Sequence, residues 1–492
     1  MSVIAKELEI ASPASLFLEM WERALTSMNA HQRMTASQPD HKFKETVLLA
    51  LSKDSGQDAY DELVSLLNVS GNLRLASERN GCVLYVMGAI DDLFYEVHPR
   101  AQVAAQFRRG ERLPAWIKGL RDLRFISGAY VRNERYSLIP RGPLLRSARN
   151  ENASNAENFL DRFAALCRVP RTLALNDRPI LVQQVVIGVD AARGVPSTGI
   201  SGTEEVVFFP IAERPGDIEM TQRSVAAAEF VDFKLREGLN PAQLLLDSIM
   251  LAGKIDIGFA PEFVMPGEQA AILSKGLRSV GKDSPRLLVA GSGQSVEVSV
   301  DGLKWNESFV FNQRGHNLWR QRKLWPAGLT AARAAQYGLR GKADRLVMED
   351  SADGDTIVVA DIDGLGRCVT LICQDVEGRP LADDLIRHFQ PDWVFVPILD
   401  PGVVTGRWAH QRTFGLSALS NARFLVASST ALSDNEDPSC GLAIGPKAAS
   451  EADGDDERVF LELKAPIGDL PAFIKIKWRS GGWQRTNLGA AV

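Results

Sequence analysis

A buried strand that ends abruptly at a cysteine constrains this 492-residue chain more than any other stretch. Residues 369–372 are apolar or β-branched, as in a buried strand, and Cys373 follows directly. A Gly-Arg-Pro turn at 378–380 then leads into a helical pattern over residues 381–389. This order places a thiol at the end of a sheet and near a helix N-terminus, which lowers a cysteine pKa and supplies donors for an oxyanion. A nucleophilic cysteine is the first hypothesis, and a structural core cysteine is its alternative.

The composition is that of an ordinary protein with room for two or more domains. A 45% share of hydrophobic residues permits large cores, and the formal net charge of −5 indicates neither nucleic-acid nor anionic-membrane binding. The cysteines are few and scattered, and the chain has no CxxC pair and no HExxH motif. The sequence therefore predicts neither a disulfide framework nor a zinc site. We expect a cytoplasmic protein, because the N-terminus lacks a signal-peptide pattern and no apolar run reaches the roughly 18 residues that span a bilayer.

Residues 1–175 carry helical patterns but no motif that names a chemistry, and they are assigned as an accessory region of unknown function and unknown partner. Basic residues between Arg108 and Arg135 are interspersed with acidic and apolar ones, which favours a solvated face over a patch for an anionic partner. Residues 149–158 are very polar and form either a linker or the start of a helix. The expected elements are helices at 15–28, 46–51 and 59–67, and a strand at 82–87.

From residue 178 onward strands alternate with helices, which predicts an α/β layered domain over residues 176–492. Segments 459–464 and 473–478 alternate as the edge strands of an antiparallel pair do. Residues 291–293 (GSG) indicate a tight turn, because no third glycine or GK[ST] follows. Residues 193–221 and 327–348 are interpreted as an added loop and an insertion. The other expected strands are 180–189, 255–260, 286–290, 305–312, 392–397 and 423–428, with helices from 240, at 268–280 and at 408–422.

Two charged residues stand out in this domain. Glu262 directly follows the apolar strand 255–260, where a carboxylate is expensive to bury without a function or a cationic partner. Lys323 lies between tryptophans in WRQRKLWP, although a lysine taken alone is usually on the surface. Glu262 after a strand, Lys323 in a segment flanked by tryptophans and Cys373 at a strand–helix elbow follow one another in the chain.

APEF around Glu262, WRQRKLWP around Lys323 and LICQDVEGRP around Cys373 together resemble the nitrilase superfamily of carbon–nitrogen hydrolases, over about residues 178–478. DWVFVPI and ALSNARFLVASS are similar to that family's later strand–helix–strand. The resemblance implies a four-layer α-β-β-α sandwich, here preceded by a helix-rich α+β region, and usually a homodimer or larger homo-oligomer.

The resemblance also implies a Glu-Lys-Cys triad that acts on a small amide or nitrile. Cys373 would be the nucleophile that forms a thioester or thioimidate, and Glu262 the general base. Lys323 would stabilise the oxyanion, with the backbone N–H of Gln374 as a second donor. No metal or organic cofactor is required.

The chain departs from the family pattern in one respect. Amidase-type members carry a second glutamate in a PxGE-like turn after the lysine, whereas residues 326–329 of this chain are PAGL. Glu349 lies far along the chain, and a surface position is expected for it. The sequence alone therefore leaves the substrate open and predicts three site residues rather than four.

Two other hypotheses stay open. One is a cysteine hydrolase in which His388 or His410 pairs with Cys373. The other is a nitrilase-like domain used for binding or assembly, for example in a bacterial defence system, with weak or no catalysis. Thiol labelling separates these hypotheses, because a catalytic Cys373 should react far faster than Cys82, Cys167, Cys368 and Cys440.

Overall fold

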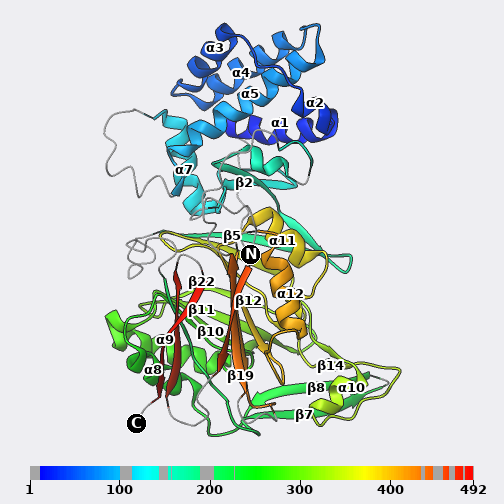
Figure 1. The fold of residues 1–492 in the computed structure, drawn as a ribbon, viewed down its shortest axis with the longest axis vertical. Coiled ribbons are helices and arrows are strands. Elements are labelled where there is room, and N and C mark those ends of the chain that lie inside the picture. Colours follow the sequence, from blue (N-terminus) through cyan, green and yellow to red (C-terminus); the bar gives the residue numbers. More distant parts are fainter. Residues whose placement is uncertain are drawn as a thin grey trace. The chain divides into compact units, whose positions relative to one another are not determined.

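The computed structural model describes residues 11–99, 113–142, 153–156, 158–188, 204–226, 228–420, 422–433, 438–446, 458–464, 471–479 and 482–490. The chain forms two compact units, shown in Figure 1. The first contains Met1–Thr172 with Gln184–Val186, and the second contains Leu173–Gln183 with Ile187–Val492. Arg108, Arg109, Arg112 and the acidic segment 448–457 lie outside the described residues.

The first unit is a helical bundle with a small three-stranded sheet. Its apolar core includes a cluster of aromatic rings, in which Trp21 lies 5.1 Å from Phe159 and 5.0 Å from Phe163 between ring centroids. Asp91 is buried and its carboxylate accepts hydrogen bonds from the backbone N–H groups of residues 164–166 at 2.8–2.9 Å, which ties a helix to the sheet. The elements are α1 (Pro13–Ser27), α2 (Ala30–Met34), α3 (His41–Leu51), α4 (Gly56–Ser70), α5 (Ala76–Tyr95), α7 (Ala115–Ser127), β1 (Val131–Arg132), β2 (Tyr136–Pro140) and β3 (Leu166–Pro170).

The strand expected at residues 82–87 is wrong, because these residues lie in the middle of α5. Cys82, Val83, Leu84, Val86 and Met87 are all buried, so this helix is apolar around most of its circumference. A short apolar run of this kind has no period that separates a buried strand from a buried helix. The three helices expected from residues 15–67 are confirmed as α1, α3 and α4.

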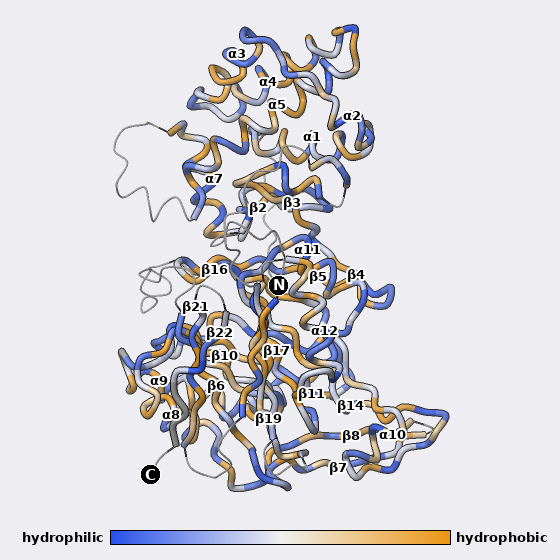
Figure 2. The backbone as a smooth tube through the Cα atoms, in the orientation of Figure 1, coloured by the Kyte–Doolittle hydropathy of each residue, from blue (hydrophilic) through white to orange (hydrophobic). Residues whose placement is uncertain are grey.

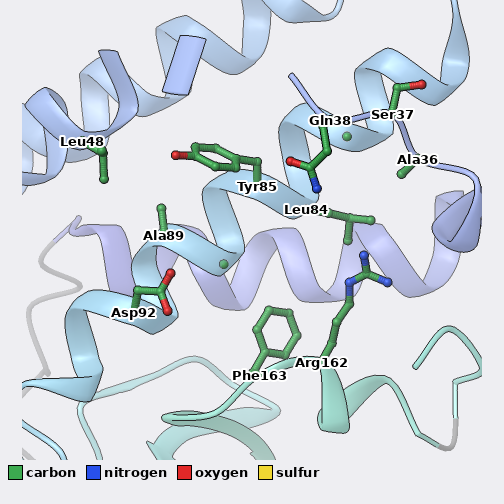
Figure 3. A pocket seen from close by; sticks show the side chains of 12 residues that line it. Ala36, Ser37, Gln38, Leu48, Leu84, Tyr85, Ala89, Asp92, Arg162 and Phe163 are labelled. Atoms are coloured by element: carbon green, nitrogen blue, oxygen red, sulfur yellow. The ribbon is translucent and has the colours of Figure 1, made fainter. Parts of the chain in front are cut away.

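A surface groove of about 260 Å³ runs along one face of α5. Figure 3 shows Leu84, Tyr85 and Ala89 along the helix, with Asp92 toward one end of the groove and Arg162 toward the other. Gly88 also lines it, and a Cβ at this position would meet no atom within 4 Å.

The second unit is built around two large mixed sheets. The seven-stranded sheet has the order β12-β11-β10-β9-β6-β21-β22, and the eight-stranded sheet has the order β20-β19-β18-β17-β16-β15-β5-β4. Their strands are β4 (Thr172–Leu175), β5 (Arg178–Ile187), β6 (Glu205–Phe208), β9 (Ile257–Phe259), β10 (Leu287–Val298), β11 (Lys304–Asn312), β12 (Asn317–Arg322), β15 (Thr356–Ile362), β16 (Gly366–Thr370), β17 (Trp393–Leu399), β18 (Arg423–Ser429), β19 (Ser439–Pro446), β20 (Arg458–Lys464), β21 (Ala472–Arg479) and β22 (Gly482–Ala490).

The two sheets pack face to face, and helices cover their outer faces. Phe259 of β9 and Phe395 of β17 are 5.6 Å apart between ring centroids, which joins the inner faces. Helices α8 (Pro241–Ala252) and α9 (Gly267–Val280) pack on the seven-stranded sheet, while α12 (Trp408–Ser417) packs on β18 and β19 and carries α11 (Leu381–Phe389) beside it. This arrangement confirms the expected four-layer α-β-β-α sandwich. The hydropathy tube is apolar along central strands such as β17, as burial on both faces requires (Figure 2).

Three details of the expected topology are wrong. The proposed loop at 193–221 contains β6, a strand inside the seven-stranded sheet. Strands β20 and β21 do not pair with one another, because β20 pairs with β19 and β21 pairs with β6 and β22. The GSG segment is not a tight turn between elements but part of β10, where the register shifts between Val289 and Ser292.

A separate four-stranded sheet includes residues from the segment interpreted as an insertion. Its order is β13-β14-β8-β7, formed by β7 (Ile218–Val225), β8 (Ala228–Leu235), β13 (Gly328–Leu329) and β14 (Val347–Glu349). The short helix α10 (Ala331–Gln336) lies between β13 and β14 in the chain. Residues 327–348 therefore form a structured extension of the second unit.

Candidate active site

The site lies where several strands end at the same edge of the sandwich. Parallel strands β16 and β17 pair up to Thr370 opposite Phe395, and Cys373 follows the end of β16 by three residues. The backbone carbonyl of Ile398 accepts a hydrogen bond from the N–H of Glu262 at 3.4 Å, although Glu262 follows β9 in the other sheet. The turns after β9, β16 and β17 are thereby brought together.

The two glycines of GSG make room for the turn that carries Glu262. A Cβ on Gly291 would lie 2.1 Å from the carbonyl oxygen of Pro261, and Gly291 has a φ of +78°. A Cβ on Gly293 would lie 2.6 Å from the backbone of Met265. The backbone N–H of Ser292, between the two glycines, donates to the carbonyl of Pro261 at 3.2 Å. The carbonyl of Ser292 accepts the N–H of Met265 at 2.9 Å. The pattern that indicated a turn marks a close approach of two backbones.

Lys323 directly follows β12 and lies in a buried cluster of charges. Its Nζ donates to Glu262 Oε1 at 2.9 Å and forms a short ion pair with Glu349 Oε2. Asn306 Nδ2 also donates to Glu262 Oε1 at 2.9 Å and to Glu349 Oε1 at 3.2 Å. Lys323 is only 1% exposed, so each charge depends on its partners for stabilisation.

Glu349 is the site residue that sequence reasoning missed. It is buried at the end of β14, contrary to the expected surface position, and its Oε2 also accepts the backbone N–H of Ala327 at 3.0 Å. The hydroxyl of Ser351 donates a further hydrogen bond to Glu349 Oε1 at 3.1 Å. The PAGL turn thus lacks an acid of its own but holds the carboxylate of Glu349 through Ala327. Apolar residues at 346–348 just before Glu349 were the signal of a buried strand end.

Cys373 lies at a strained elbow between β16 and a 3₁₀ turn (Cys373–Val376). Its φ is +49°, a left-handed backbone conformation that non-glycine residues adopt rarely and mostly at functional sites. The carboxylate of Asp375 accepts hydrogen bonds from the N–H groups of Leu324 and Trp325, each at 2.9 Å, and of Ile372 at 3.1 Å. Asp375 therefore fixes the elbow to the segment that follows Lys323.

Burial raises the pKa of the Cys373 thiol well above its ordinary value, and the neighbouring Glu262 carboxylate raises it further while Lys323 lowers it. The expectation of a lowered cysteine pKa is wrong. The elbow and the nearby helix terminus favoured a lowered cysteine pKa. The burial of the sulfur and the carboxylates beside it raise the pKa by more than the elbow and the helix terminus lower it. The thiol is protonated at neutral pH, so a nucleophilic role requires a base next to it.

Glu262 meets that requirement. Burial raises the pKa of its carboxyl, the charge of Lys323 lowers it, and Glu349 raises it again, with a hydrogen bond to the Cys373 thiol among the smaller contributions. Burial alone would lower the pKa of Lys323, but Glu262 and Glu349 raise it well above the ordinary value. Lys323 is consequently an ammonium ion throughout the working pH range, able to donate to an anion but unable to act as a base.

Gln374 directly follows Cys373 in the 3₁₀ turn, so its backbone N–H stays a predicted second donor for an oxyanion. The two histidines lie elsewhere: His388 is exposed on α11, and the ring of His410 packs on Phe460 at 4.9 Å and accepts the N–H of Gly406. These positions give no support to a Cys–His pair.

The extension at 327–348 contributes two further groups near the thiol. Arg333 of α10 pairs with Asp400 at 2.9 Å, and its electrostatic influence reaches Cys373. Tyr337 donates to the carbonyl of Leu399 at 3.2 Å, and burial raises the pKa of its phenol.

Within the described residues, no three side chains of His, Cys, Asp or Glu gather as a metal-binding group. None of the helices that the structure describes is long and apolar enough to cross a bilayer.

Solved structures similar to this chain include Nit3 of Saccharomyces cerevisiae, named as a member of branch 10 of the nitrilase superfamily, at 16% identity over 54% of this chain and 91% of that chain, with a TM-score of 0.33. An amidase from Nesterenkonia sp. is 16% identical over 55% of this chain and 93% of its own, with a TM-score of 0.33. A mutant of the Nesterenkonia AN1 amidase is likewise named as a protein from the nitrilase superfamily. The similarity is to the nitrilase superfamily.

The glutamine-dependent NAD+ synthetase of Acinetobacter baumannii is 13% identical over 59% of this chain and 48% of that chain, with a TM-score of 0.38. No protein-family model matches the sequence. No curated protein matches it either. At these identities the nitrilase-like similarity concerns the fold, and the chemistry rests on the geometry of this chain.

Proposed function

We propose that this chain is a cysteine-dependent hydrolase of non-peptide carbon–nitrogen bonds, in amides or nitriles, that forms a covalent thioester or thioimidate on Cys373. The observation that carries the proposal is the buried Glu262–Lys323–Glu349 cluster next to a thiol held at positive φ. A domain used only for binding or assembly has no physical need for such a cluster, because apolar residues of similar volume are often as stable as buried ion pairs. The cluster therefore favours catalysis over the assembly hypothesis.

The proposed reaction begins with proton transfer. Glu262 takes the proton of the Cys373 thiol as the sulfur attacks the amide carbon, and Lys323 with the N–H of Gln374 stabilises the resulting oxyanion. The C–N bond then breaks as the proton passes from Glu262 to the leaving nitrogen, which departs as ammonia or an amine. Water, deprotonated by Glu262, hydrolyses the thioester, so that the acid leaves and the thiol regains its proton.

A small-amide panel with two readouts tests this proposal. Ammonia release is measured from butyramide, acrylamide and fluoroacetamide, and intact-protein mass spectrometry follows each reaction. Fluoroacetamide is included because its acetamide moiety adds to the active-site cysteine in a mutant of the Nesterenkonia amidase. We expect turnover or a single adduct on Cys373, with neither in Cys373→Ala and a rate lowered about 100-fold or more in Glu262→Gln.

Cys167→Ala is the matched control, because it removes a buried thiol from the other compact unit. It should leave both readouts unchanged. Equal, slow modification of all five cysteines without ammonia release would contradict the proposal and favour the binding or assembly hypothesis. Three expectations stay predictions. They are the division into an accessory region and a hydrolase domain, the assembly into a homo-oligomer, and a partner for residues 1–175.

A further inference from the structure

Four buried side-chain oxygens near the proposed catalytic cluster have no hydrogen-bond partner among the described residues. They are the hydroxyls of Ser292, Ser308 and Thr370, and Asn306 Oδ1. The three hydroxyl residues are 0% exposed and Asn306 is 2% exposed, so bulk solvent does not reach them. Buried polar groups in folded proteins are almost always paired, because an unpaired one costs free energy. These oxygens therefore require partners that the described side chains do not supply.

Two of the hydroxyls lie next to one another on the inner face of the seven-stranded sheet. Ser292 of β10 pairs with Ser308 of β11, and Ser308 pairs in turn with Gln321 of β12, so their side chains share one face. The amide of Gln321 donates to the carbonyl of Thr356 and accepts the N–H of Val358, each at 2.9 Å. Both of these residues belong to β15 in the eight-stranded sheet. The two serines therefore face the space between the sheets.

The third hydroxyl faces the same space from the eight-stranded sheet. Thr370 of β16 pairs with Phe395 of β17, whose ring lies 5.6 Å from that of Phe259 in the other sheet. Strand β16 also pairs with β15, the strand that Gln321 contacts, and this pairing includes Val369 next to Thr370. We call Ser292, Ser308 and Thr370 the inter-sheet hydroxyls.

Asn306 connects the inter-sheet hydroxyls to the buried charges. Its Nδ2 donates to Glu262 Oε1 at 2.9 Å and to Glu349 Oε1 at 3.2 Å, which uses both hydrogens of the amide nitrogen. The reversed amide would place Oδ1 against two carboxylates, so the observed orientation is the favourable one. Ser308 lies two residues farther along the same strand and on the same face. Asn306 Oδ1 therefore needs a donor within the sandwich.

The spacing of these oxygens fits water molecules as their partners. Residues two apart on a strand are separated by roughly 7 Å, and packed sheets by about 10 Å, which is too far for short side chains to bond directly. Two hydrogen bonds of about 2.8 Å through one water span most of that separation. Buried waters typically have two to four polar partners. The inter-sheet hydroxyls are neutral and both donate and accept, so they suit water better than a metal ion or an anion.

We propose that ordered waters bind to the inter-sheet hydroxyls and to Asn306 Oδ1, and that these waters hold the amide of Asn306 against Glu262 and Glu349. Asn306 is then a positioning residue, which acts through the two carboxylates and takes no part in bond making or breaking. The water site stands on the packing of the sheets alone, whereas the positioning role rests on the proposed function.

A count of long-lived internal waters in the full chain gives the first test. Magnetic relaxation dispersion of the solvent measures such waters in solution. We expect Ser308→Ala and Thr370→Val each to lower the amplitude of the dispersion, and the double variant to lose the contribution of at least one water. Thr413→Val is the matched control, because Thr413 is also 0% exposed but its hydroxyl donates to the carbonyl of Ala409 at 2.6 Å. It should keep the amplitude. An unchanged amplitude in the double variant overturns the proposal.

Thermal unfolding distinguishes a hydroxyl that binds water from one without a partner. Replacing an unpaired buried hydroxyl by a methyl group of similar shape stabilises a chain, whereas removing one partner of a bound water leaves the others unpaired. We therefore expect the melting temperature of Thr370→Val to fall below that of the wild type. A melting temperature above the wild type would contradict the water site.

The pH dependence of adduct formation with fluoroacetamide tests the positioning role of Asn306. Its hydrogen bond favours the ionised form of Glu262, so a displaced amide raises the pKa of this carboxyl. The acidic limb of the rate profile should then move to higher pH in Ser308→Ala and stay in place in Thr413→Val. A limb that stays in place in both variants would remove the positioning role. Absence of any adduct, with the water signal lost as expected in the double variant, would support the water site and contradict the hydrolase.

Discussion

Glu349 connects two segments that are separate in the sequence. Its carboxylate accepts hydrogen bonds from the ammonium of Lys323 and from the backbone of Ala327 on one oxygen, and from Asn306 and Ser351 on the other. Every one of these partners is a donor. A negatively charged acceptor is therefore the only side chain of this shape that satisfies the position.

Glu349→Gln tests this position. The amide nitrogen of glutamine would face a donor in either orientation, and the loss of charge would leave Lys323 with one counterion. We expect kcat for amide turnover to fall about 100-fold and the free energy of unfolding to fall by about 1–3 kcal/mol. Glu297→Gln is the control, because Glu297 is 55% exposed and pairs with surface arginines. Unchanged turnover in Glu349→Gln would show that Glu262 alone keeps Lys323 in place.

The sequence predicted three of the four buried side chains discussed for this site, namely Glu262, Lys323 and Cys373, but not Glu349. Glu262 and Cys373 each follow an apolar strand, and Lys323 lies in a segment flanked by tryptophans, so these three positions were readable from their neighbours and from the motifs around them. Glu349 was missed: the apolar residues 346–348 indicated a buried strand end, but its contact with the turn after Lys323 goes through the backbone N–H of Ala327, which carries no sequence signal. The raised pKa of Cys373 was also beyond the sequence, since it depends on burial and on carboxylates distant in the chain.

At the scale of elements, strand β10 supports the turn after β9. The register shift between Val289 and Ser292 and the two nearby glycines let the backbone of Pro261–Met265 approach β10 directly, and side chains at Gly291 and Gly293 would prevent this. The position of Glu262 thus depends on a neighbouring strand that contributes no side chain to the chemistry.

Gly291→Ala is expected to displace the turn that carries Glu262. The new Cβ would meet the carbonyl oxygen of Pro261 and would also face a φ of +78°, so the free energy of unfolding should fall by about 2–4 kcal/mol and adduct formation at Cys373 should slow. Gly302→Ala is a matched control with a φ of +76° and no atom within 4 Å of the added Cβ. It shares the backbone strain alone and should destabilise by about 1 kcal/mol without an effect at Cys373. Equal effects of the two changes would contradict this account.

The sequence predicted the alternation of strands and helices well where a helix has its own period, as in α8, α9 and α11. It failed where tertiary context decides. The fully buried α5 has the same apolar run as a strand, and β6 is a strand of four residues that follows a segment without a clear pattern. The partners of β20 and β21 depend on which sheet each strand joins, and alternation alone contains no such information.

At the scale of the whole molecule, several carboxyl groups are buried without full compensation. Burial raises the pKa of Glu213 to about 8, that of Asp375 to about 7 and that of Asp392 to about 6. The folded chain therefore binds more protons than the unfolded chain between about pH 4 and pH 8. The stability that these groups contribute is fully present below their unfolded pKa values and is lost as the pH rises through the folded values.

We expect the melting temperature to fall as the pH is raised from 5.5 to 8.5. Groups with lowered pKa values, such as Glu297 and Glu462, act in the opposite sense only in more acidic solution. Glu213→Gln should flatten the alkaline part of the profile and melt above the wild type at pH 9, by on the order of 2–4 kcal/mol in unfolding free energy. Calorimetric scans across this range measure both effects. A wild-type profile that rises toward pH 8.5 would show that Glu213 stays ionised in the folded chain.

The protonated resting state of Cys373 also bears on how the protein survives oxidative stress. Hydrogen peroxide oxidises thiolates far faster than thiols, and a sulfenic acid on this sulfur would block any acyl transfer. Because burial and the adjacent carboxylates keep the proton on the sulfur, peroxide meets a thiol rather than a thiolate. The same burial that makes the thiol a weak nucleophile at rest also slows its oxidation to the sulfenic acid.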